Sequence, residues 1–379
     1  MLNGPAWLPV YAQMPLTAVS GHGSWLVDEQ GNRWLDAYGG HAVASTGHAH
    51  PHVVAAIQRQ AAQLIFYSTA VPLRLREEFA DRLAERCPGD LSRVFFCNSG
   101  AEANENALGL ARKATGRRKI VSVAGGWHGR TVACLAVTDG AKYEAGALRA
   151  GMPLSLKVPF NDVAALEAAV DDSVAAVIVE PVQGLTGARD CAPEFLRAAR
   201  AACDRAGAAL IFDEIQCGVG RSGAFTAAEV YQVTPDILTL AKGLASGLPI
   251  GAMIATSAIT STLVPGDLGS TFGGGPVVCA AALATLEVID REGLYQNVKR
   301  VSAHLREWAC GRGLGVQGLG LLLGFRLPAP AALVQRALFE QRVLTGTASD
   351  PAILRLLPPL TFSLEEAGLL LAALDQVLS

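Results

Sequence analysis

The chain has 379 residues, of which 51% are apolar and 17% are charged, and its formal net charge is −3. This composition is typical of a globular protein with large cores, and it excludes a mainly disordered chain. No block of basic residues stands out, so we expect no nucleic-acid partner.

Three further features of the sequence concern location. No Lys or Arg precedes Arg33, so the N-terminal stretch lacks the charged region of a signal peptide. No apolar run reaches membrane-spanning length without a charge or a turn. The eight cysteines form no C-x-x-C pair, which favours buried reduced thiols over disulfides or a zinc site. We expect a cytoplasmic protein that does not bind membranes.

The first predicted elements are a hairpin at residues 24–37 and helices at residues 51–64 and 73–87. Strands and helices then alternate. Continuous apolar runs predict strands at residues 93–98, 119–124, 174–180, 208–214, 236–241 and 249–255, with helices at 99–115 and 193–207. Strands without polar alternation are buried on both faces of a parallel or mixed sheet, and ligands bind at the ends of such strands.

The pattern changes near residue 276. The predicted elements from there on are helices at 277–290 and 295–309, a strand at 321–327, a helix, a strand at 352–357 and a last helix from Leu364. We expect three parts. These are an N-terminal segment, 1–45, that packs with the small domain; a large α/β domain, 46–270; and an interdomain helix with a small α+β domain, 271–379.

The run Gly218–Gly223 reads G-x-G-x-x-G after an apolar strand, which is the pattern of a dinucleotide-binding turn and hence of an NAD-dependent dehydrogenase. That fold requires a helix that begins inside the glycines and an acid about 20 residues further on. This loop instead carries the bulky Arg221. Asp236 lies 16 positions after Gly220 (236 − 220), but it opens the next strand instead of closing one. We therefore disfavour the dehydrogenase.

Two charged residues lie at the ends of predicted buried strands. Lys242 follows the strand at 236–241, and Asp213 lies near the end of the strand at 208–214. A buried lysine attacks carbonyl groups as an amine, and a buried carboxylate needs a partner such as a protonated ring nitrogen. Pyridoxal 5'-phosphate requires this pair. The alternatives are a lysine in a surface loop and an aspartate that caps a helix or forms a salt bridge.

A helix start after the strand at 93–98 offers a phosphate site. Ser99 and Gly100 begin the helix, and free N–H groups at a helix start favour an anion. The same segment also reads as a capping box formed by Ser99 and Glu102, and the two interpretations are compatible.

The loop at residues 125–130 offers Trp127 as a flat face for a ring and Arg130 as a fork for a carboxylate. The alternative is a glycine-rich turn with an exposed arginine, in which His128 caps or packs. The histidine run at residues 48–52 lacks nearby carboxylate or cysteine ligands, so we expect a loop before a helix and no metal site.

Taken in order, these motifs resemble the class III (subgroup II) pyridoxal-phosphate aminotransferases, the acetylornithine and ornithine aminotransferase group. The matching stretches, from about Leu16 to the C-terminus, are LDAYGGHAVASTGHAHP, VFFCNSGAEANENALGLARKATGRRKI, WHGRT, KVPFND, VIVEPVQG, LIFDEIQCGVGRSG, PDILTLAKGLASGLPIGA, GSTFGGGPVVCAAALATLEVI and LRLLPPL. The resemblance implies the pyridoxal-phosphate transferase fold type I, in which a large mixed-sheet α/β domain binds the cofactor beside a small α+β domain. It also implies a homodimer with shared active sites.

The resemblance further implies roles for the residues at matching positions. Lys242 would bind the cofactor covalently and move protons, and Asp213 would pair with the ring nitrogen. The residues implied to bind the cofactor are Ser99, Gly100, Ala101, Trp127, Asp213, Ile215, Gln216, Lys242 and, across the dimer, Thr271. The residues implied to lie at the substrate are Arg130, Glu180, Ser270 and Arg355.

The chain departs from the family pattern at two positions. Leu185 stands where several relatives have a glutamate that pairs with the second arginine, which is Arg355 here, and masks it while the diamine is bound. We expect altered discrimination between amino donors, because Arg355 would lack that partner. The second departure is Gly275, where the family tends to have Asn.

The implied reaction is a transamination between a small-molecule amino donor and 2-oxoglutarate. Our first choice of donor is N-acetylornithine, in arginine biosynthesis, which yields a semialdehyde and glutamate. Carrier-protein-linked lysine and free ornithine are the alternatives within the class. Outside it stand the dehydrogenase and a non-catalytic protein on the same fold, which we disfavour because Lys242, Asp213 and Arg130 are all present.

Overall fold

The computed structural model describes residue 8 and residues 10–379, so the start of the predicted N-terminal segment, residues 1–7 and 9, lies outside the described residues. Within this part, one seven-stranded sheet has the order β4-β12-β11-β10-β7-β5-β6. Its strands are β4 (Leu91–Cys97), β5 (Lys119–Val123), β6 (Leu156–Val158), β7 (Val174–Val179), β10 (Ala209–Asp213), β11 (Ile237–Leu240) and β12 (Gly251–Thr256). Only β12 runs antiparallel to its neighbours among these described strands, so the other strands all end at the same edge.

Helices cover both faces of this sheet. They are α4 (Gly100–Thr115), α5 (Val132–Val137), α6 (Ala141–Arg149), α7 (Val163–Ala169), α8 (Pro193–Ala206), α9 (Ala227–Tyr231) and α10 (Ser257–Thr260). Val177 and Phe212 pack in one core with Phe195 of α8, whereas Ile178 and Ile211 pack in another with Leu108 of α4. Because neighbouring residues of a strand point to opposite faces, the all-apolar strands β7 and β10 feed both cores.

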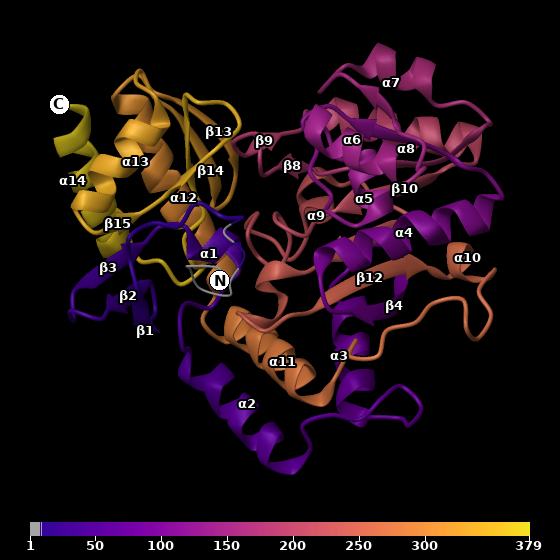
Figure 1. Ribbon diagram of the computed structural model, residues 1–379, viewed down its shortest axis with the longest axis horizontal. Helices are drawn as coiled ribbons and strands as arrows, with labels where there is room; N and C mark the ends of the chain where they lie inside the picture. Colours follow the sequence, from indigo (N-terminus) through magenta and orange to yellow (C-terminus); the bar gives the residue numbers. More distant parts are fainter. Residues whose placement is uncertain (1–7, 9) are drawn as a thin grey trace, which may run out of the picture.

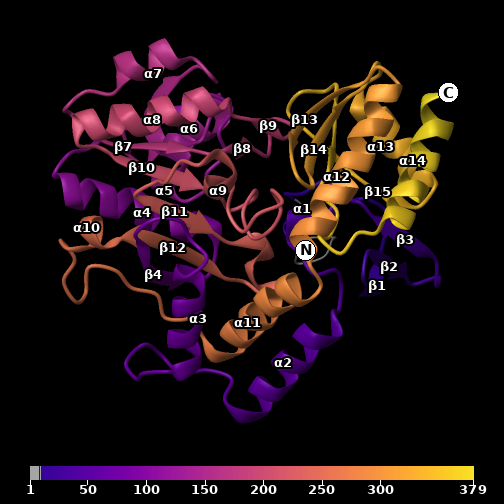
Figure 2. The ribbon, with the colours of Figure 1, turned by 180° about the vertical axis from the view of Figure 1, so that it is seen from behind.

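A smaller lobe lies beside this sheet in Figure 1 and, from behind, in Figure 2. It contains two four-stranded sheets, built from β1 (Ala18–His22), β2 (Trp25–Asp28), β3 (Arg33–Asp36) and β15 (Val343–Leu344), and from β13 (Gly315–Leu319), β14 (Leu322–Arg326), β16 (Gly346–Thr347) and β17 (Ile353–Leu356). Its helices are α12 (Leu294–Gly311), α13 (Ala331–Glu340) and α14 (Leu364–Leu378). The predicted hairpin is confirmed as β2 and β3, and β3 pairs with β15 near the C-terminus. We call these elements the small lobe.

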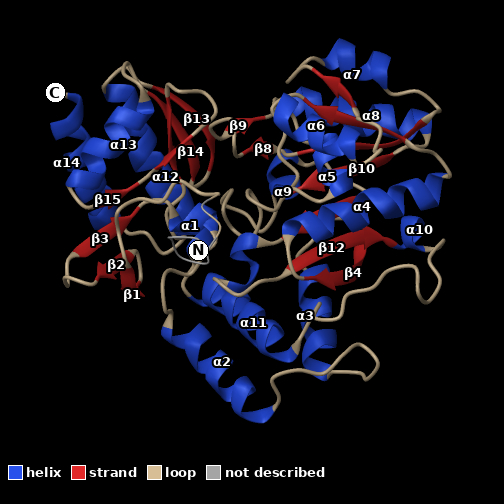
Figure 3. Cartoon of the chain, viewed as in Figure 1, coloured by secondary structure: helices blue, strands red, loops and turns tan. Residues whose placement is uncertain are grey.

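Three helices lie below the large sheet in the view of Figure 3. They are α2 (Pro51–Gln63), α3 (Arg74–Ala84) and α11 (Pro276–Arg291), and α11 packs against the other two. Short elements complete the chain: α1 (Gly39–Ala42), β8 (Val182–Gln183) and β9 (Arg189–Asp190). Across residue 8 and residues 10–379, every helix falls short of the length or the hydrophobicity that a membrane crossing requires.

The predicted long helices and the apolar strands are confirmed with small shifts at their ends. The elements that the sequence did not predict include β1, β6, β13 and the short helices from α5 to α7.

A buried carboxyl group, that of Glu214, lies just after β10. Its oxygens accept the N–H groups of Ala227 at 2.5 Å and of Ala228 at 2.8 Å, which begin α9. Burial raises the pKa of Glu214 to about 8, although the two backbone N–H groups act in the opposite direction. The folded protein therefore holds this proton more tightly than the unfolded chain does.

We expect Glu214 to make the free energy of unfolding depend on pH. Because the folded pKa is the higher one, its stabilising contribution is complete below about pH 4.5 and is lost as the pH rises toward 8. Urea unfolding of the wild type and of Glu214→Gln should therefore diverge by about 1 kcal/mol or more between pH 5 and pH 8, with the wild type losing more. A constant difference between the two proteins would show that Glu214 stays ionised in the folded state.

Candidate active site

The carboxyl ends of the parallel strands carry most of the predicted site residues. Asp213 is the last residue of β10, Glu180 follows β7, and Lys242 lies just beyond β11. Their side chains meet at a cavity of about 450 Å³. The predicted residues that line it are Ser99, Gly100, Ala101, Trp127, Arg130, Glu180, Asp213, Ile215, Gln216 and Lys242.

The Asp213 carboxylate is almost fully buried, with 3% of the residue exposed. Its Oδ2 accepts a hydrogen bond from Nδ2 of Asn104 at 2.7 Å and lies 2.8 Å from Nδ1 of His128. Its Oδ1 accepts the N–H of Ile215 at 3.1 Å. These bonds compensate for the hydration that a carboxylate loses on burial, and they fix it in the wall of the cavity.

Lys242 is the first residue of a short 3₁₀-helix, η1 (Lys242–Ala245), and its backbone φ is +42°. Residues other than glycine rarely adopt this left-handed backbone conformation, and those that do are enriched at functional sites. Burial lowers the pKa of Lys242, whereas the charges of Asp213 and Glu180 raise it. A lowered pKa increases the fraction of unprotonated amine, which is the form that attacks a carbonyl group.

Glu180 connects two loops at the cavity. Its Oε1 accepts the N–H of Trp127 at 2.7 Å, and its Oε2 accepts the N–H of Gly184 at 3.2 Å. Burial raises the pKa of Glu180 to about 7, with a further contribution from the charge of Asp213. Glu180 therefore holds the loop after β5 against the loop after β7.

The start of α4 forms another part of the cavity wall. Ser99 is the N-cap, and its Oγ accepts the N–H of Glu102 at 3.2 Å. Gly100 and Ala101 occupy the first turn, where an N–H group has no acceptor inside its own helix. The Glu102 carboxylate accepts the N–H of Asn98 instead of that of Ser99, so only half of the predicted capping box forms. Free N–H groups and the helix dipole favour an anion at this point, and the phosphate site stays a prediction.

The loop after β5 brings Trp127 and Arg130 to the cavity. The guanidinium carbon of Arg130 lies 5.4 Å from the centre of the Trp127 ring and 5.9 Å from that of Tyr143. Arg130 is exposed, and in the described part of the chain it pairs with no carboxylate. Its charge is therefore free to bind the carboxylate of a ligand.

Three predicted residues lie outside the lining of the cavity. Arg355, on β17, is buried and donates hydrogen bonds to the carbonyl oxygens of Thr347 and Gly184 and to the hydroxyl of Tyr38, at 2.6, 3.0 and 2.8 Å. Ser270 and Thr271 lie in the loop before α11. Ser270 Oγ accepts a hydrogen bond from Nδ2 of Asn98 at 3.2 Å, and Thr271 is exposed. The roles of these three residues stay predictions.

Two partners of Asp213, Asn104 and His128, were not assigned a role from the sequence. Nδ2 of Asn104 also donates to the backbone oxygen of His128 at 2.8 Å, and its Oδ1 accepts from Thr239 at 2.8 Å. Asn104 shares a helix face with the buried residues Ala107, Leu108 and Ala111. A polar residue in an apolar stripe is thus the signal that would have marked it.

Pyridoxal 5'-phosphate offers an aldehyde, a ring nitrogen and a phosphate. The cavity presents a complementary group for each: the amine of Lys242, the carboxylate of Asp213 and the free N–H groups at the start of α4. Trp127 and Ile215 add apolar surface for the ring. The residues present therefore fit this cofactor.

Two motifs of the sequence lie outside this cavity. The glycine run at 218–223 belongs to the loop between β10 and α9, and the helix that follows begins at Ala227, after the glycines. This geometry differs from that of a dinucleotide turn. The histidine run binds carboxylates of other elements, in the pairs His48–Asp36, His50–Glu292 and His52–Glu287, at 2.8, 2.9 and 2.6 Å.

Comparisons with known proteins agree with this site. The sequence matches the family model for aminotransferase class-III over residues 9–378. It is 40% identical over 373 residues to acetylornithine aminotransferase 1 of Bordetella parapertussis, covering 94% of this chain and 93% of that one. It is 43% identical over 377 residues to acetylornithine aminotransferase of Streptomyces coelicolor, covering 97% and 92%.

The fold is similar to that of a solved structure, the ornithine aminotransferase from Toxoplasma gondii ME49. The TM-score is 0.91 at 31% sequence identity, and the match covers 98% of this chain and 92% of that one.

We expect His128 to set the affinity for pyridoxal 5'-phosphate, because its Nδ1 lies 2.8 Å from Oδ2 of Asp213 and helps to hold that carboxylate in place. Loss of this hydrogen bond should leave the buried carboxylate with one partner fewer and less well placed to pair with a charged ring nitrogen. His128→Leu should weaken cofactor binding about tenfold, as measured by visible absorbance during titration. His128→Asn, which can still donate to Asp213, should lose less. Equal affinities in the wild type and in His128→Leu would contradict this role.

Proposed function

Because the chain belongs to the class III aminotransferases, we propose that it transfers the terminal amino group of N-acetylornithine to 2-oxoglutarate, a reaction of arginine biosynthesis. The products are a semialdehyde and glutamate. Relatives named acetylornithine aminotransferases, about 40% identical over nearly the whole chain, support this donor. The observation that carries the proposal is a half-buried lysine and a hydrogen-bonded, buried carboxylate at one cavity that also contains a free helix start.

The enzyme depends on pyridoxal 5'-phosphate, which when bound supplies an aldehyde that accepts the amino group and a ring that withdraws electrons. Residues of the chain move the proton and place a negative charge at the ring nitrogen. The Lys242 amine, whose pKa burial lowers, accepts a proton at Nζ and returns it, as general base and acid. Asp213, held by Asn104 and His128, keeps a negative charge where a ring nitrogen would be protonated.

Two arginines are candidates for the carboxylates of the substrates. We propose that Arg130 binds the carboxylate distant from the reacting carbon, and that Arg355 binds the carboxylate attached to that carbon in 2-oxoglutarate. Arg355 supports this role because its hydrogen bonds go to two carbonyl oxygens and a hydroxyl, which leave its charge uncancelled. N-acetylornithine has no carboxylate on its reacting carbon, so Arg355 would serve mainly the second half of the reaction.

We propose a homodimer whose subunits complete each other's sites. The loop at residues 64–67 exposes a run of large apolar side chains, with Ile65 71% exposed, and Phe66 packs 5.1 Å from Phe272, which is itself 63% exposed. Apolar surface of this kind is typical of an interface between proteins. Thr271 adjoins Phe272 in the chain and is exposed, so a second copy on this face would contact it.

We propose the cytoplasm as the location of the enzyme. All eight cysteines are free thiols, and most of them are buried, which is typical of a protein in a reducing compartment.

The donor is identified by a panel of complete reactions with different amino donors. Enzyme loaded with cofactor is given 2-oxoglutarate and N-acetylornithine, ornithine, a lysine derivative or 4-aminobutyrate, and glutamate is measured. We expect the highest kcat/KM with N-acetylornithine. Lys242→Ala should abolish turnover with every donor, because Lys242 is the one lysine lining the cavity in the described residues.

The panel also separates the alternatives. A higher kcat/KM with ornithine would make free ornithine the donor, which the similarity to the Toxoplasma gondii enzyme makes the second candidate. Turnover that survives in Lys242→Ala would mean that another amine does the chemistry. Borohydride reduction followed by peptide mapping should place the cofactor on Lys242, independently of any turnover.

We expect Leu185 to keep Arg355 available to 2-oxoglutarate. Leu185 follows Gly184, whose carbonyl oxygen accepts a hydrogen bond from Arg355. A carboxylate introduced at this position would pair with Arg355 and compete with the substrate. Leu185→Glu should therefore raise the KM for 2-oxoglutarate roughly tenfold, equivalent to about 1.4 kcal/mol. Leu185→Gln is the matched control, because glutamine has the size of glutamate but no charge. An equal rise of this KM in both variants would exclude the electrostatic explanation.

A further inference from the structure

The glycine run of the sequence contains a buried arginine, Arg221, that the reaction described above does not use. Only 2% of the residue is exposed, and no ion pair of the described residues includes it. Burial lowers its pKa to about 9, so the guanidinium is still protonated at neutral pH. A buried charge without a carboxylate partner costs free energy, and its presence calls for a compensating role.

Arg221 bridges the two lobes. It follows β10 in the chain, on the large sheet, but its Nη1 donates to the carbonyl oxygens of Leu321 at 3.2 Å and of Pro358, which both belong to the small lobe. Its backbone oxygen also accepts the N–H of Leu321 at 2.9 Å. Nη2 is buried and has no partner among the described residues.

The glycines of the run allow this close approach. A Cβ atom on Gly220, whose φ is +87°, would lie 2.9 Å from the side chain of Leu360. Across the junction, a Cβ atom on Gly320 would collide with the backbone oxygen of Arg221. Larger residues would hold the lobes apart, so the spacing that resembles a dinucleotide motif serves the contact between them.

The segment that Arg221 holds also carries Arg355. Pro358 lies three positions after Arg355 (358 − 355). The same segment is tied to the cofactor side of the cavity, because Leu360 donates its N–H to the backbone oxygen of Ser45 at 2.7 Å. Ser45 Oγ in turn donates to the backbone oxygen of Gly243, the neighbour of Lys242, at 2.6 Å.

We propose that Arg221 is a positioning residue for 2-oxoglutarate: it fixes β17, and with it Arg355, at the correct distance from Asp213 and Lys242. The inference rests on the proposed function, because it takes 2-oxoglutarate as the acceptor and Arg355 as the residue that binds one of its carboxylates. A shift of the small lobe would move Arg355 relative to the reacting carbon, while the donor, which lacks a carboxylate there, would be little affected.

The two half-reactions are measured separately by rapid mixing. Enzyme loaded with pyridoxal 5'-phosphate is mixed with N-acetylornithine, and enzyme loaded with the aminated cofactor is mixed with 2-oxoglutarate. Arg221→Met, which keeps the length but removes the charge and its donors, should lower the efficiency with 2-oxoglutarate about tenfold or more. The efficiency with N-acetylornithine should change less than about twofold. Arg221→Lys should recover part of the loss, and it serves as the main variant if Arg221→Met does not fold.

Two further measurements distinguish positioning from a general structural role. In the background of Arg355→Met, Arg221→Met should have almost no further effect on 2-oxoglutarate, because the residue through which it acts is gone. Hydrogen exchange of the Leu357 and Leu360 amides, which bond to the oxygens of Ala37 and Ser45, should be faster in Arg221→Met.

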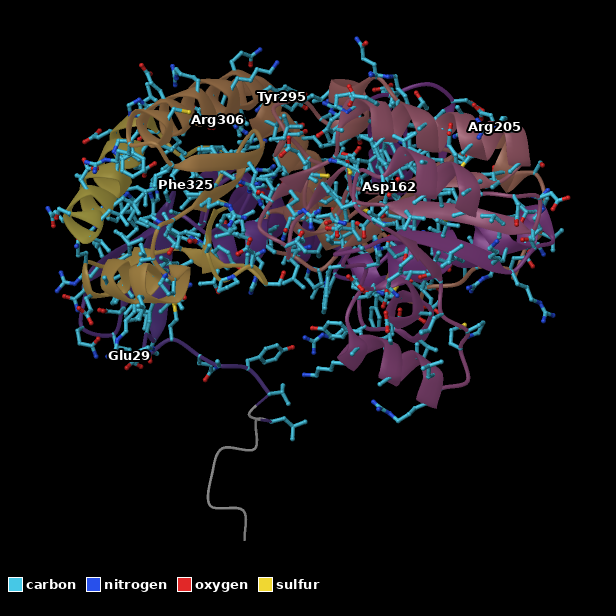
Figure 4. All side chains as sticks on the ribbon, turned by 90° about the horizontal axis from the view of Figure 1, so that it is seen from above. Glu29, Asp162, Arg205, Tyr295, Arg306 and Phe325 are labelled. Atoms are coloured by element: carbon cyan, nitrogen blue, oxygen red, sulfur yellow. The ribbon has the colours of Figure 1, made fainter. Side chains whose placement is uncertain are left out.

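Arg306→Met is the matched control. Arg306, on α12 in the same lobe as Phe325 (Figure 4), also donates to a backbone carbonyl, that of Gly318 within the small lobe. Both half-reactions should be unchanged in it. Equal losses in the two half-reactions of Arg221→Met would overturn the proposal. Additive effects of Arg221→Met and Arg355→Met on the reaction with 2-oxoglutarate would overturn it as well. If the wild type does not react with 2-oxoglutarate, the proposed function fails, while unchanged exchange of the two amides would refute the role of Arg221 by itself.

Discussion

The site depends on one constraint: a carboxylate buried at the end of a central strand must find hydrogen-bond donors that replace water. Asp213 meets it with hydrogen bonds from Asn104, His128 and the N–H of Ile215. Each partner comes from a different element, so the bonds also join α4, the loop after β5 and the end of β10. A cationic ring completes the compensation when the cofactor is bound, which makes cofactor affinity and local packing parts of the same electrostatic balance.

The sheet brings these elements together because its strands, except β12, share one direction. Residues far apart in sequence, such as Ser99, Glu180 and Lys242, then emerge at one edge. The small lobe contributes Arg355, on β17, to the site from another direction. Its contribution can be maintained only if the lobes keep a fixed distance, and backbone contacts at glycine positions provide that constraint at little cost in volume.

The sequence predicted much of this arrangement, because buried parallel strands are continuous apolar runs, and because Asp213 ends one of them and Lys242 lies just beyond another. It could not predict the strand order, since pairing between distant strands leaves no local signal. β13 was missed because Gly315 and Gly318 interrupt its pattern. His128 was missed because a histidine in a glycine-rich loop has many possible uses, and only the fold reveals that its ring reaches Asp213. Arg221 was noted as a bulky residue among glycines, but its partners lie a hundred residues or more away.

The two buried arginines at the lobe junction have neutral hydrogen-bond acceptors instead of carboxylate partners. Arg355 and Arg221 donate to carbonyl oxygens, and Arg355 also to a hydroxyl, so neither positive charge is cancelled by a carboxylate in contact with it. Neutral acceptors satisfy the donors while leaving the field of the charge intact. That field acts on Lys242, whose pKa the charge of Arg355 helps to lower, after burial. The same field attracts an acidic ligand, so one arrangement favours both a reactive amine and a dicarboxylate substrate.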